Sequence, residues 1–580
     1  MGFIQRLMNL IDKNKVFAFL SFNFIFIFLF ILTYKGISMN MDAIGWQRLE
    51  KVIVSTMLFS LMVSVLAERK KEYLLPILCG CLYFLGIAGT FALYTEKIGV
   101  GFRETHYELF FAEALVVILL ALRKILYRQS FILSFIEISI CSLALFEIVY
   151  YFLFGISVNS DTLMILFQTN WLETLAFIDD NKIIFVCFLF LIIVLFMVIY
   201  FFNKKHEIDV SNKKKILAGF ILLVVCIVNY HLVIGGEHLY LHRDFKIAQG
   251  YFKQIKMLSE QVGIQEEITS DSNVRTAVIV IGESACRDYM NVYGYERDNT
   301  PWMTQNKNNK NFIFFDNTYS SYKLTNKSLI YLLTEKSQYN DKEVYSSLNF
   351  IEIAKAAGFK TYWISNQGNI SNYRESYNVV AQRADNKRFL EEEDYGGLDE
   401  DLLKLIDIPV NNDKKIIVIH LAGSHSPYKN YPSSFKKFLE DNVNDNYDNT
   451  ILYTDYVLQQ IFEKLKADNL DLFIYISDHG EKKGILRNQF DFRMERIPFV
   501  MYCSDYYIKM NNNLKKIKYA KSKYFSSDMF YDTFLGLIGI DDKFYMQNQN
   551  LFSDTYSYNR YNLKTEYGTI DIKDDPYDKN

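Results

Sequence analysis

Long apolar runs fill most of the first 235 residues of this 580-residue chain, and they constrain its fold more than any other feature. A helix needs roughly 17–25 apolar residues to cross a bilayer. A single run of this kind is typical of a buried helix in a soluble protein, but five or more in succession indicate a multi-span membrane domain. The fourth run is the weakest, because it is short and carries Glu113. The seven runs cover residues 16–34, 52–67, 74–94, 109–122, 131–154, 183–202 and 216–234.

Charges in the connecting loops give these runs a direction. If the N-terminus is cytoplasmic and all seven runs cross, the inner segments carry 14 Lys and Arg residues and the outer loops carry 6. Positive charge near the membrane ends stays on the cytoplasmic side, so everything after residue 234 is predicted to lie outside the cytoplasm. The first run is longer than a signal-peptide core and lacks a small-residue cleavage site, so we expect it to be an anchor.

Three parts follow from this pattern. We expect a transmembrane domain over residues 1–235, with the loop 155–182 outside the cytoplasm, and a water-soluble catalytic domain over residues 271–580. Between them, residues 236–270 mix aromatic and basic side chains, which suits either a helix on the membrane surface or a plain connecting helix. Roughly the last 25 residues are polar, and we expect them to be peripheral.

Charge and cysteine content exclude some classes of protein. The formal net charge is −3 and no basic stripe is present, so the sequence gives no sign of nucleic-acid binding. Five of the seven cysteines lie in the apolar runs, and only Cys286 and Cys503 lie in the soluble part. An exported domain could join these two, but nothing indicates a disulfide framework. We therefore expect both to be free.

The soluble part alternates short apolar strands with helical patterns. This alternation predicts an α/β domain with a mostly parallel sheet and helices on both faces. In such sheets, reactive groups gather beyond the carboxyl ends of the strands. The expected strands cover residues 275–282, 312–315, 360–365, 415–421, 472–477 and 497–503.

Polar residues follow these strands at the expected places. Only three histidines come after residue 270, and His420, His425 and His479 all lie at or just after the end of an expected strand. Glu283 directly follows another strand, and the stretch FIYISDHGE places Asp478 beside His479. Oxygen and nitrogen ligands without thiolates suit zinc or manganese. Glu283, Asp478 and His479 are therefore predicted to form a metal site with one partner still to be found.

Five motifs in the same order carry a resemblance to a known family. GESACRDYMNVYGYERDNTP, SDHGE, HLAGSHSPY, YDNTILYTDYVL and, ahead of the soluble part, QTNWLETLAF resemble segments of the bacterial phosphoethanolamine transferases. That family modifies lipid A or the lipopolysaccharide core. The resemblance implies a multi-span anchor followed by an alkaline-phosphatase/sulfatase-like catalytic domain, with Zn²⁺ as the cofactor.

The resemblance also implies the missing ligand and the nucleophile. The Thr-x-x-Ser pattern of the family falls on Thr325 and Ser328, so Thr325 is expected to bind the zinc and to attack the substrate. Coordination to a dication favours the alkoxide of a hydroxyl group. A threonine at this place also suits a helix cap. Four nearby hydroxyl groups compete for the role, those of Thr318, Ser320, Ser321 and Ser328.

Further residues carry expected roles in catalysis and substrate binding. His425 is expected to bind the phosphate or protonate the leaving oxygen, or else to contact the metal ligands and hold them in place. Glu481 is expected either to support the ligands or to bind a second metal, and His420 to orient its neighbours. Thr169 and Glu173 lie four residues apart, on one helical face, and the resemblance implies that they contact the head group of the lipid donor. They could instead merely cap and solvate a short helix.

The implied activity is transfer of phosphoethanolamine from phosphatidylethanolamine to lipid A or a core sugar, through a phospho-threonine enzyme in the bacterial inner membrane, with the catalytic domain in the periplasm. Departures from the family pattern leave the acceptor and the metal count open, because Ile165 replaces a frequent Asn and KKGILRNQF lacks a further His. The alternatives are a glycerol-phosphate transferase of the lipoteichoic-acid synthase type, a membrane-anchored phosphatase or sulfatase, and a non-enzymatic scaffold.

Overall fold

The computed structural model divides the chain into two compact units, Met1–Gly250 and Tyr251–Asn580. The division falls inside helix α12 (Tyr240–Ser259), which occupies the expected linker. The structure describes residues 13–37, 46–68, 70–97, 105–169, 174–175, 178, 181–205, 210–236, 238–261, 263–264, 266–268, 270–367, 375–390, 397–484, 490–511, 514–540 and 542–578.

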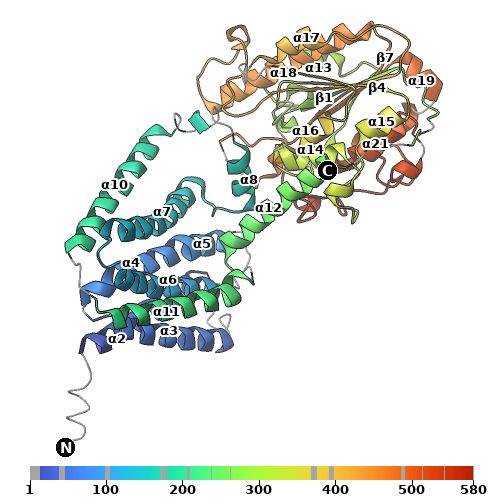
Figure 1. Cartoon of the computed structure of the whole chain (residues 1–580). Helices are drawn as coiled ribbons and strands as arrows, with labels where there is room; N and C mark the ends of the chain where they lie inside the picture. The colour runs from blue at the N-terminus through green and yellow to red at the C-terminus, as the bar shows by residue number, and fades with distance from the viewer. Residues whose placement is uncertain are drawn as a thin grey trace, which may run out of the picture. The chain divides into compact units, whose positions relative to one another are not determined.

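The described part of the first unit is built of helices, and the apolar runs lie almost entirely within them (Figure 1). They are α2 (Lys13–Ile37), α3 (Trp46–Leu66), α4 (Lys70–Tyr83), α5 (Thr90–Lys97), α6 (Thr105–Ile125), α7 (Ser130–Phe154), α8 (Ser160–Gln168), α10 (Lys182–Lys205) and α11 (Asn212–Asn229). A π-helical segment, Phe84–Gly89, joins α4 to α5 in one continuous rod.

Five segments of these helices are long and apolar enough to cross a membrane, judged over the described residues by length and composition. They are Lys15–Thr33, Leu49–Leu66, Glu72–Tyr94, Ser130–Phe154 and Lys182–Lys205. The runs at 109–122 and 216–234 form α6 and α11 but are not among the five, so the count of seven spans stays a prediction.

Helix α6 lies inside the bundle, and most of its side chains are buried. It packs against α3, α4 and α11. Its Glu113 is fully buried and accepts a hydrogen bond of 2.5 Å from the Thr56 hydroxyl of α3. An ionisable side chain is costly in contact with lipid, so such residues in membrane helices usually face the bundle interior.

The second unit is built on a seven-stranded sheet in the order β2-β8-β7-β1-β6-β4-β5. Strand β1 is parallel to β6 and β7, and β4 is parallel to β5 and β6, whereas β8 is antiparallel to β2 and β7. The mostly parallel sheet expected from the sequence is confirmed. The strands are β1 (Thr276–Gly282), β2 (Phe312–Phe314), β4 (Lys360–Ser365), β5 (Asn386–Phe389), β6 (Lys415–His420), β7 (Leu470–Ser477) and β8 (Phe499–Cys503).

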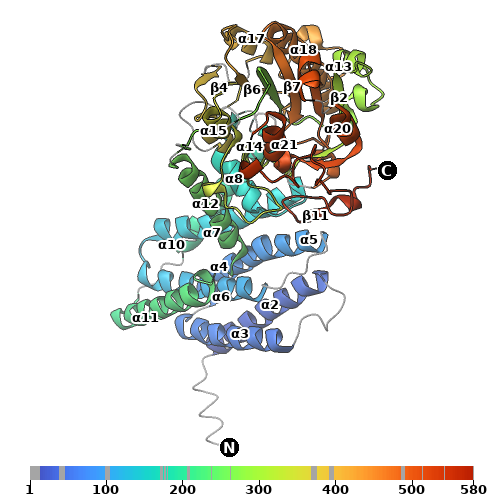
Figure 2. The same ribbon diagram turned by 90° about the vertical axis from the view of Figure 1, so that its right-hand side faces the viewer.

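Helices cover both faces of this sheet, as Figures 1 and 2 show. Alternate residues of β1 enter two separate hydrophobic cores, with Ile279 in one and Val280 in the other. The core around Ile279 includes residues of α14 (Thr325–Leu333), α15 (Phe350–Ala356), α16 (Ser376–Ala381) and α21 (Phe530–Leu537). The core around Val280 includes residues of α13 (Pro301–Asn306), α17 (Leu402–Leu405) and α18 (Val443–Lys466).

The C-terminal segment is not peripheral, so that expectation is wrong. The Asp575 carboxylate is buried and pairs with Arg496 Nη1 at 2.5 Å. Near the small hairpin of β10 (Lys564–Thr565) and β11 (Ile570–Asp571), the Glu566 carboxylate pairs with Lys323 Nζ at 2.6 Å. Two carboxylates of the segment therefore pair with buried cations. Cys286 and Cys503 are both buried and free, as expected.

Candidate metal centre and active site

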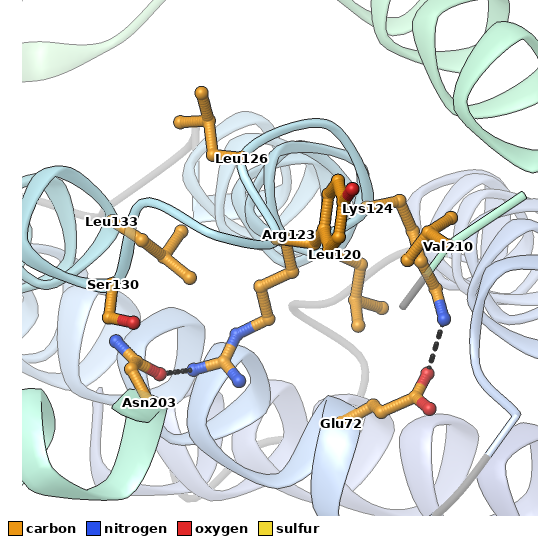
Figure 3. A pocket seen from close by; sticks show the side chains of 10 residues that line it. Glu72, Leu120, Arg123, Lys124, Leu126, Ser130, Leu133, Asn203 and Val210 are labelled. Atoms are coloured by element: carbon orange, nitrogen blue, oxygen red, sulfur yellow. Dashed lines mark hydrogen bonds and ion pairs between the residues drawn. The ribbon is translucent and has the colours of Figure 1, made fainter. Parts of the chain in front are cut away.

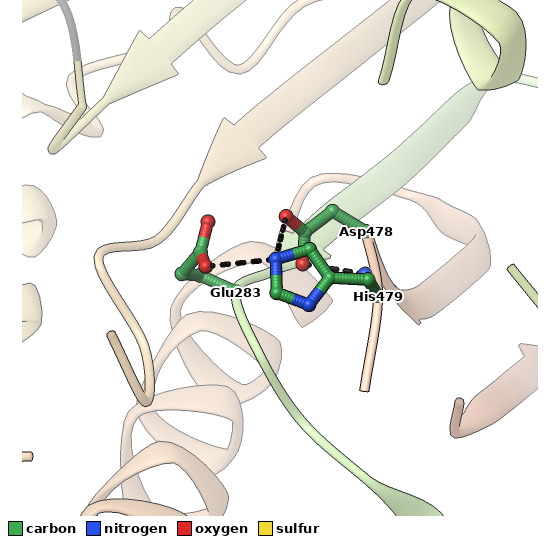
Figure 4. Close-up of side chains that lie close together, drawn as sticks. All are labelled: Glu283, Asp478 and His479. Atoms are coloured by element: carbon green, nitrogen blue, oxygen red, sulfur yellow. Dashed lines mark hydrogen bonds and ion pairs between the residues drawn. The ribbon is translucent and has the colours of Figure 1, made fainter. Parts of the chain in front are cut away.

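The candidate metal centre lies where β1 and β7 end side by side. Gly282 of β1 pairs with Ser477 of β7 in a parallel register, so Glu283 and Asp478 leave the sheet together (Figure 4). The carboxylates of Glu283 and Asp478 and the imidazole of His479 offer ligand atoms that all lie within 4.8 Å of one another. All three side chains are buried. The structure thus brings together the three predicted ligands.

The orientation of His479 suits a bound cation. Its Nδ1 lies 2.6 Å from the carbonyl oxygen of Gly480, which can only accept, so Nδ1 carries a proton. In the neutral ring Nε2 then presents a lone pair, 3.4 Å from Glu283 Oε1 and 3.3 Å from Asp478 Oδ2. A lone pair facing two carboxylates is repulsive unless a cation lies between them.

Asp478 gives a second sign of the same kind. Its Oδ1 accepts hydrogen bonds from the backbone amides of Ser284 at 3.0 Å and His479 at 2.7 Å. Its Oδ2 is buried and accepts no hydrogen bond from any described residue. Burial, and then the negative charge of Glu283, raise the pKa of the Asp478 carboxyl group. A buried oxygen left without a donor costs free energy, and a dication would remove both that cost and the repulsion.

Thr325 is the first residue of α14, and its hydroxyl group lies against Glu283 and His479. Thr325 Oγ1 donates to Glu283 Oε2 at 3.1 Å and lies 3.2 Å from His479 Nε2. The N-cap position belongs to Leu324, so the threonine hydroxyl is not used as a cap. The Thr325 side chain is half-buried, which leaves it accessible from one side.

The four competing hydroxyl groups have other surroundings. Ser320 Oγ donates to Glu495 Oε2 at 2.6 Å, and Ser328 Oγ donates to the carbonyl oxygen of Asp478 at 2.5 Å. The hydroxyl groups of Thr318 and Ser321 are buried without a hydrogen-bond partner among the described residues. The Ser328 bond ties the first turn of α14 to the end of β7, which helps to hold Thr325 in place.

Two polar residues missed by the sequence reasoning support the centre. The Gln367 amide donates from Nε2 to Glu283 Oε2 at 3.3 Å and to the carbonyl oxygen of Leu421 at 2.6 Å. Asp399 accepts from the backbone amides of Ala422 at 2.8 Å and Gly423 at 2.9 Å, which fixes the loop after β6. Gln367 follows β4, so the rule that polar groups gather after parallel strands could have found it. No local signal marks Asp399.

The remaining predicted residues are placed differently. His420 is fully buried on β6 against Tyr377, with 4.8 Å between ring centroids, and burial lowers its pKa to about 4. It is therefore neutral at pH 7. His425 is exposed, with Nδ1 2.7 Å from the carbonyl oxygen of Ser426. Glu481 is buried, and its Oε1 accepts from the backbone amide of Lys482 at 3.0 Å. Neither His425 nor Glu481 is in the group of three ligands.

The expected donor-lipid residues lie in the first unit. Thr169 follows α8 as its C-cap, and its hydroxyl donates to the carbonyl oxygen of Ile165 at 2.7 Å. Glu173 lies outside the described residues. Their predicted contact with a lipid head group stays a prediction.

Known proteins resemble this chain in its second unit and over most of its length. The family model described as Sulfatase matches residues 275–540. "Phosphoethanolamine transferase EptC" of Escherichia coli (strain K12) is 30% identical over 266 residues, which make up 41% of this chain and 46% of that protein. The chain thus matches about half the length of this relative.

Two further comparisons cover more of the chain. A Haemophilus influenzae (strain Rd) protein named "Putative phosphoethanolamine transferase" is 29% identical over 472 residues, 76% of this chain and 90% of that protein. The structure of the integral membrane protein lipooligosaccharide phosphoethanolamine transferase A (EptA) from Neisseria meningitidis has the same fold, with a TM-score of 0.58, 18% identity and coverage of 82% of this chain and 97% of that one. The chain therefore contains a sulfatase-family domain over residues 275–540, and several of its homologues are named phosphoethanolamine transferases.

Proposed function

We propose that this chain transfers phosphoethanolamine from phosphatidylethanolamine to lipid A or a lipopolysaccharide core sugar, with Thr325 as the nucleophile. The observation that carries the proposal is the position of the Thr325 hydroxyl, 3.1 Å from Glu283 Oε2 and 3.2 Å from His479 Nε2 at the start of α14. The names of the homologues support phosphoethanolamine as the transferred group.

The proposed cofactor is Zn²⁺, held by Glu283, Asp478, His479 and Thr325. Oxygen and nitrogen donors in a group of four suit this ion. The fit rests on two features described above, the Asp478 Oδ2 atom that lacks a hydrogen-bond donor and the His479 Nε2 lone pair that faces two carboxylates. When bound, zinc supplies positive charge that favours a threonine alkoxide and neutralises phosphoryl oxygens.

The first displacement uses residues of the centre. Thr325 Oγ1 attacks the phosphorus of phosphatidylethanolamine while its proton passes to Glu283 Oε2, the acceptor of its hydrogen bond. The bond between phosphorus and the diacylglycerol oxygen breaks, and His425 protonates the departing oxygen. The N-terminus of α14, a nine-residue helix, favours the negative charge of the phosphoryl group.

The second displacement regenerates the enzyme. A hydroxyl or phosphate oxygen of the acceptor attacks the phosphorus of phospho-Thr325, and the bond between phosphorus and Thr325 Oγ1 breaks. Glu283 returns the proton to Thr325, and the exposed His425 takes the proton of the acceptor. The reaction needs no ATP, because the donor is itself a phosphodiester.

We propose the bacterial inner membrane as the location, with residues 1–235 as the membrane domain, 236–270 as linker and 271–580 as a periplasmic catalytic domain. The five apolar helices and the excess of Lys and Arg in one set of loops support this. Thr169 and Glu173 would then lie on the same side of the membrane as the catalytic domain.

The test is the intact mass of the purified chain after incubation with phosphatidylethanolamine and zinc. A phosphoethanolamine increment that maps to Thr325, vanishes in Thr325→Ala and persists in Thr325→Ser would support the proposal. A glycerol-phosphate increment from mixed lipids would favour the glycerol-phosphate transferase instead. Ester hydrolysis without any adduct would favour a phosphatase and overturn the transferase proposal.

A further inference from the structure

A polar pocket lies in the first unit, and its lining residues all precede Thr325 in the sequence by more than 100 positions (Figure 3). It is formed where α4 begins, α6 ends, α7 begins and α10 ends, and it encloses about 470 Å³ with its open mouth included. Its polar lining includes Glu72, Arg123, Lys124, Ser130 and Asn203. Ionisable side chains between membrane helices are costly, so a cluster of them indicates a function.

Arg123 is held in one orientation but keeps hydrogen-bonding capacity. Its Nη2 donates to Glu137 Oε1 at 2.8 Å and to Asn203 Oδ1 at 2.6 Å, and its Nε donates to Glu137 Oε1 at 3.1 Å. Asn203 Nδ2 completes the arrangement by donating to Glu137 Oε2 at 2.7 Å. Nη1 makes no hydrogen bond to any described residue. The guanidinium group is therefore fixed in place with donors left for an anionic ligand.

Within the described part of the chain, Glu72 has an unused hydrogen-bond acceptor, whereas Arg123 has unused donors. Its Oε2 accepts from Lys124 Nζ at 2.6 Å and from the backbone amide of Glu68 at 3.1 Å. Its Oε1 is buried and has no hydrogen-bond donor among the described residues, although only 7% of Glu72 is exposed. A buried carboxylate oxygen without a donor costs free energy, so a donor from a ligand would stabilise the site.

The charges of the site restrict the ligand. The cations Arg123 and Lys124 are matched by the carboxylates of Glu137 and Glu72. Glu68 lies nearby but pairs with Lys214 at 2.6 Å. The first four of these charges cancel, so together they give no net attraction to a charged ligand. The site needs a ligand with an anionic acceptor for Arg123 and a cationic N–H donor for Glu72.

We propose that this pocket binds the phosphoethanolamine head group of a membrane lipid, with the phosphate on Arg123 and the ammonium on Glu72 Oε1. A choline head group has no N–H to give Glu72, and a glycerol head group adds a net negative charge. The site is separate from the proposed catalytic centre and does not depend on it. On the proposed topology, the basic flanks of α6, α10 and α11 place the pocket at the cytoplasmic leaflet.

The test is photo-crosslinking of the full-length chain in phosphatidylcholine nanodiscs. The probe is a small fraction of phosphatidylethanolamine with a diazirine near the carboxyl end of one acyl chain, which leaves the head group intact. We expect labelled peptides that contain Arg123 or Asn203. Excess unlabelled phosphatidylethanolamine should abolish the labelling, whereas an equal excess of phosphatidylglycerol should not.

Two variants and a control test whether the labelled lipid occupies this pocket. Glu72→Gln exchanges a charged acceptor for a neutral one, so labelling should fall about tenfold. Val210→Phe places a larger side chain at a lining residue that is 7% exposed, and it should block labelling without changing any charge. Lys213→Gln removes an exposed cation at the same end of α11, and labelling should change less than about twofold.

Each result decides the matter. Wild-type labelling that phosphatidylglycerol displaces equally well would overturn the proposal, as would unchanged labelling in folded Glu72→Gln or Val210→Phe protein. If Glu72→Gln does not fold, Val210→Phe and the competition series still decide. Labelling within residues 275–540 is read separately, so failure of the proposed transferase activity would not be mistaken for failure here.

Discussion

Lys323 and Glu566 form a buried ion pair of 2.6 Å that joins the segment before Thr325 to the C-terminal segment. Glu566 Oε1 also accepts from the backbone amide of Lys323 at 3.2 Å, so both charge and backbone are held. Nearby, Thr565 Oγ1 donates to the carbonyl oxygen of Ser320 at 2.7 Å. The C-terminal segment thus fixes the backbone of residues 320–323, which directly precede the proposed nucleophile, Thr325.

The first prediction follows from this pair. Glu566→Gln removes the carboxylate that pairs with the buried Lys323 charge, which costs about 3 kcal/mol. We expect a lower melting temperature and slower transfer, because Thr325 is less well positioned. Asp554→Asn is the control, since Asp554 pairs with Lys516 at 2.7 Å in an exposed position, and it should cost less than about 1 kcal/mol. Equal effects of the two substitutions would contradict a special role for the C-terminal segment.

The second prediction concerns Asp455 and pH. Its carboxylate accepts from the backbone amides of Trp302 at 2.7 Å and Met303 at 3.1 Å, and burial raises its pKa to about 7. The folded state therefore binds a proton more tightly than the unfolded state, whose carboxyl group has the ordinary pKa near 3.8. The stability due to this group is present below pH 4 and is lost as pH rises toward 7, by at most about 1.4 kcal/mol per pH unit.

Asp455→Asn checks this directly. The variant should lose the part of the pH dependence that lies between pH 4 and 7, while its stability relative to wild type rises over that range. Tryptophan fluorescence, to which Trp302 beside Asp455 contributes, can follow the melting of both proteins. Parallel stability curves for the two proteins across this range would show that the carboxyl group does not titrate there.

Sequence patterns predicted the residues of the candidate metal centre because parallel strands align their ends. Glu283, Asp478 and His479 each follow the last residues of a strand, and the pairing of β1 with β7 brings them together. The edge strand β5 was missed, because its sequence, Asn-Lys-Arg-Phe, is polar and half-buried and carries no apolar alternation.

Contacts between distant segments could not be predicted in the same way. The pairing of Lys323 with Glu566 spans 243 positions and depends on where the polar C-terminal segment lies. The buried network of Arg123, Glu137 and Asn203 looks in sequence like ordinary polar residues at helix ends, because only the packing of α6, α7 and α10 brings them together. A pattern in one segment carries no information on the segment that packs against it.

The third prediction concerns metal removal. Without a cation, Glu283 and Asp478 repel each other in a buried place, so chelation should lower the melting temperature of the second unit. Zinc at 100 times its dissociation constant should restore about 2.7 kcal/mol. Asp478→Asn removes one of the two charges, so we expect the metal-free variant to melt above metal-free wild type and to respond little to zinc. A zinc response as large as that of wild type would show that Asp478 is not a ligand.

The fourth prediction concerns Gln367, which holds Glu283 in place. Its Nε2 donates to both Glu283 Oε2 and the carbonyl oxygen of Leu421, and so fixes the carboxylate relative to the loop that leads to His425. Gln367→Leu keeps the size of the side chain but removes both hydrogen bonds. We expect zinc affinity to fall about tenfold, since residues that orient metal ligands typically contribute that much.

Gln367→Glu separates orientation from charge. This variant keeps the length of the side chain but places a third carboxylate beside Glu283, so zinc should bind at least as tightly as in wild type while the donor that orients Glu283 is lost. If the orientation of Glu283 matters for catalysis, transfer should be slow in both variants, although zinc affinity falls in Gln367→Leu and is kept or raised in Gln367→Glu. Transfer rates that simply follow zinc occupancy would instead show that Gln367 acts only through the metal.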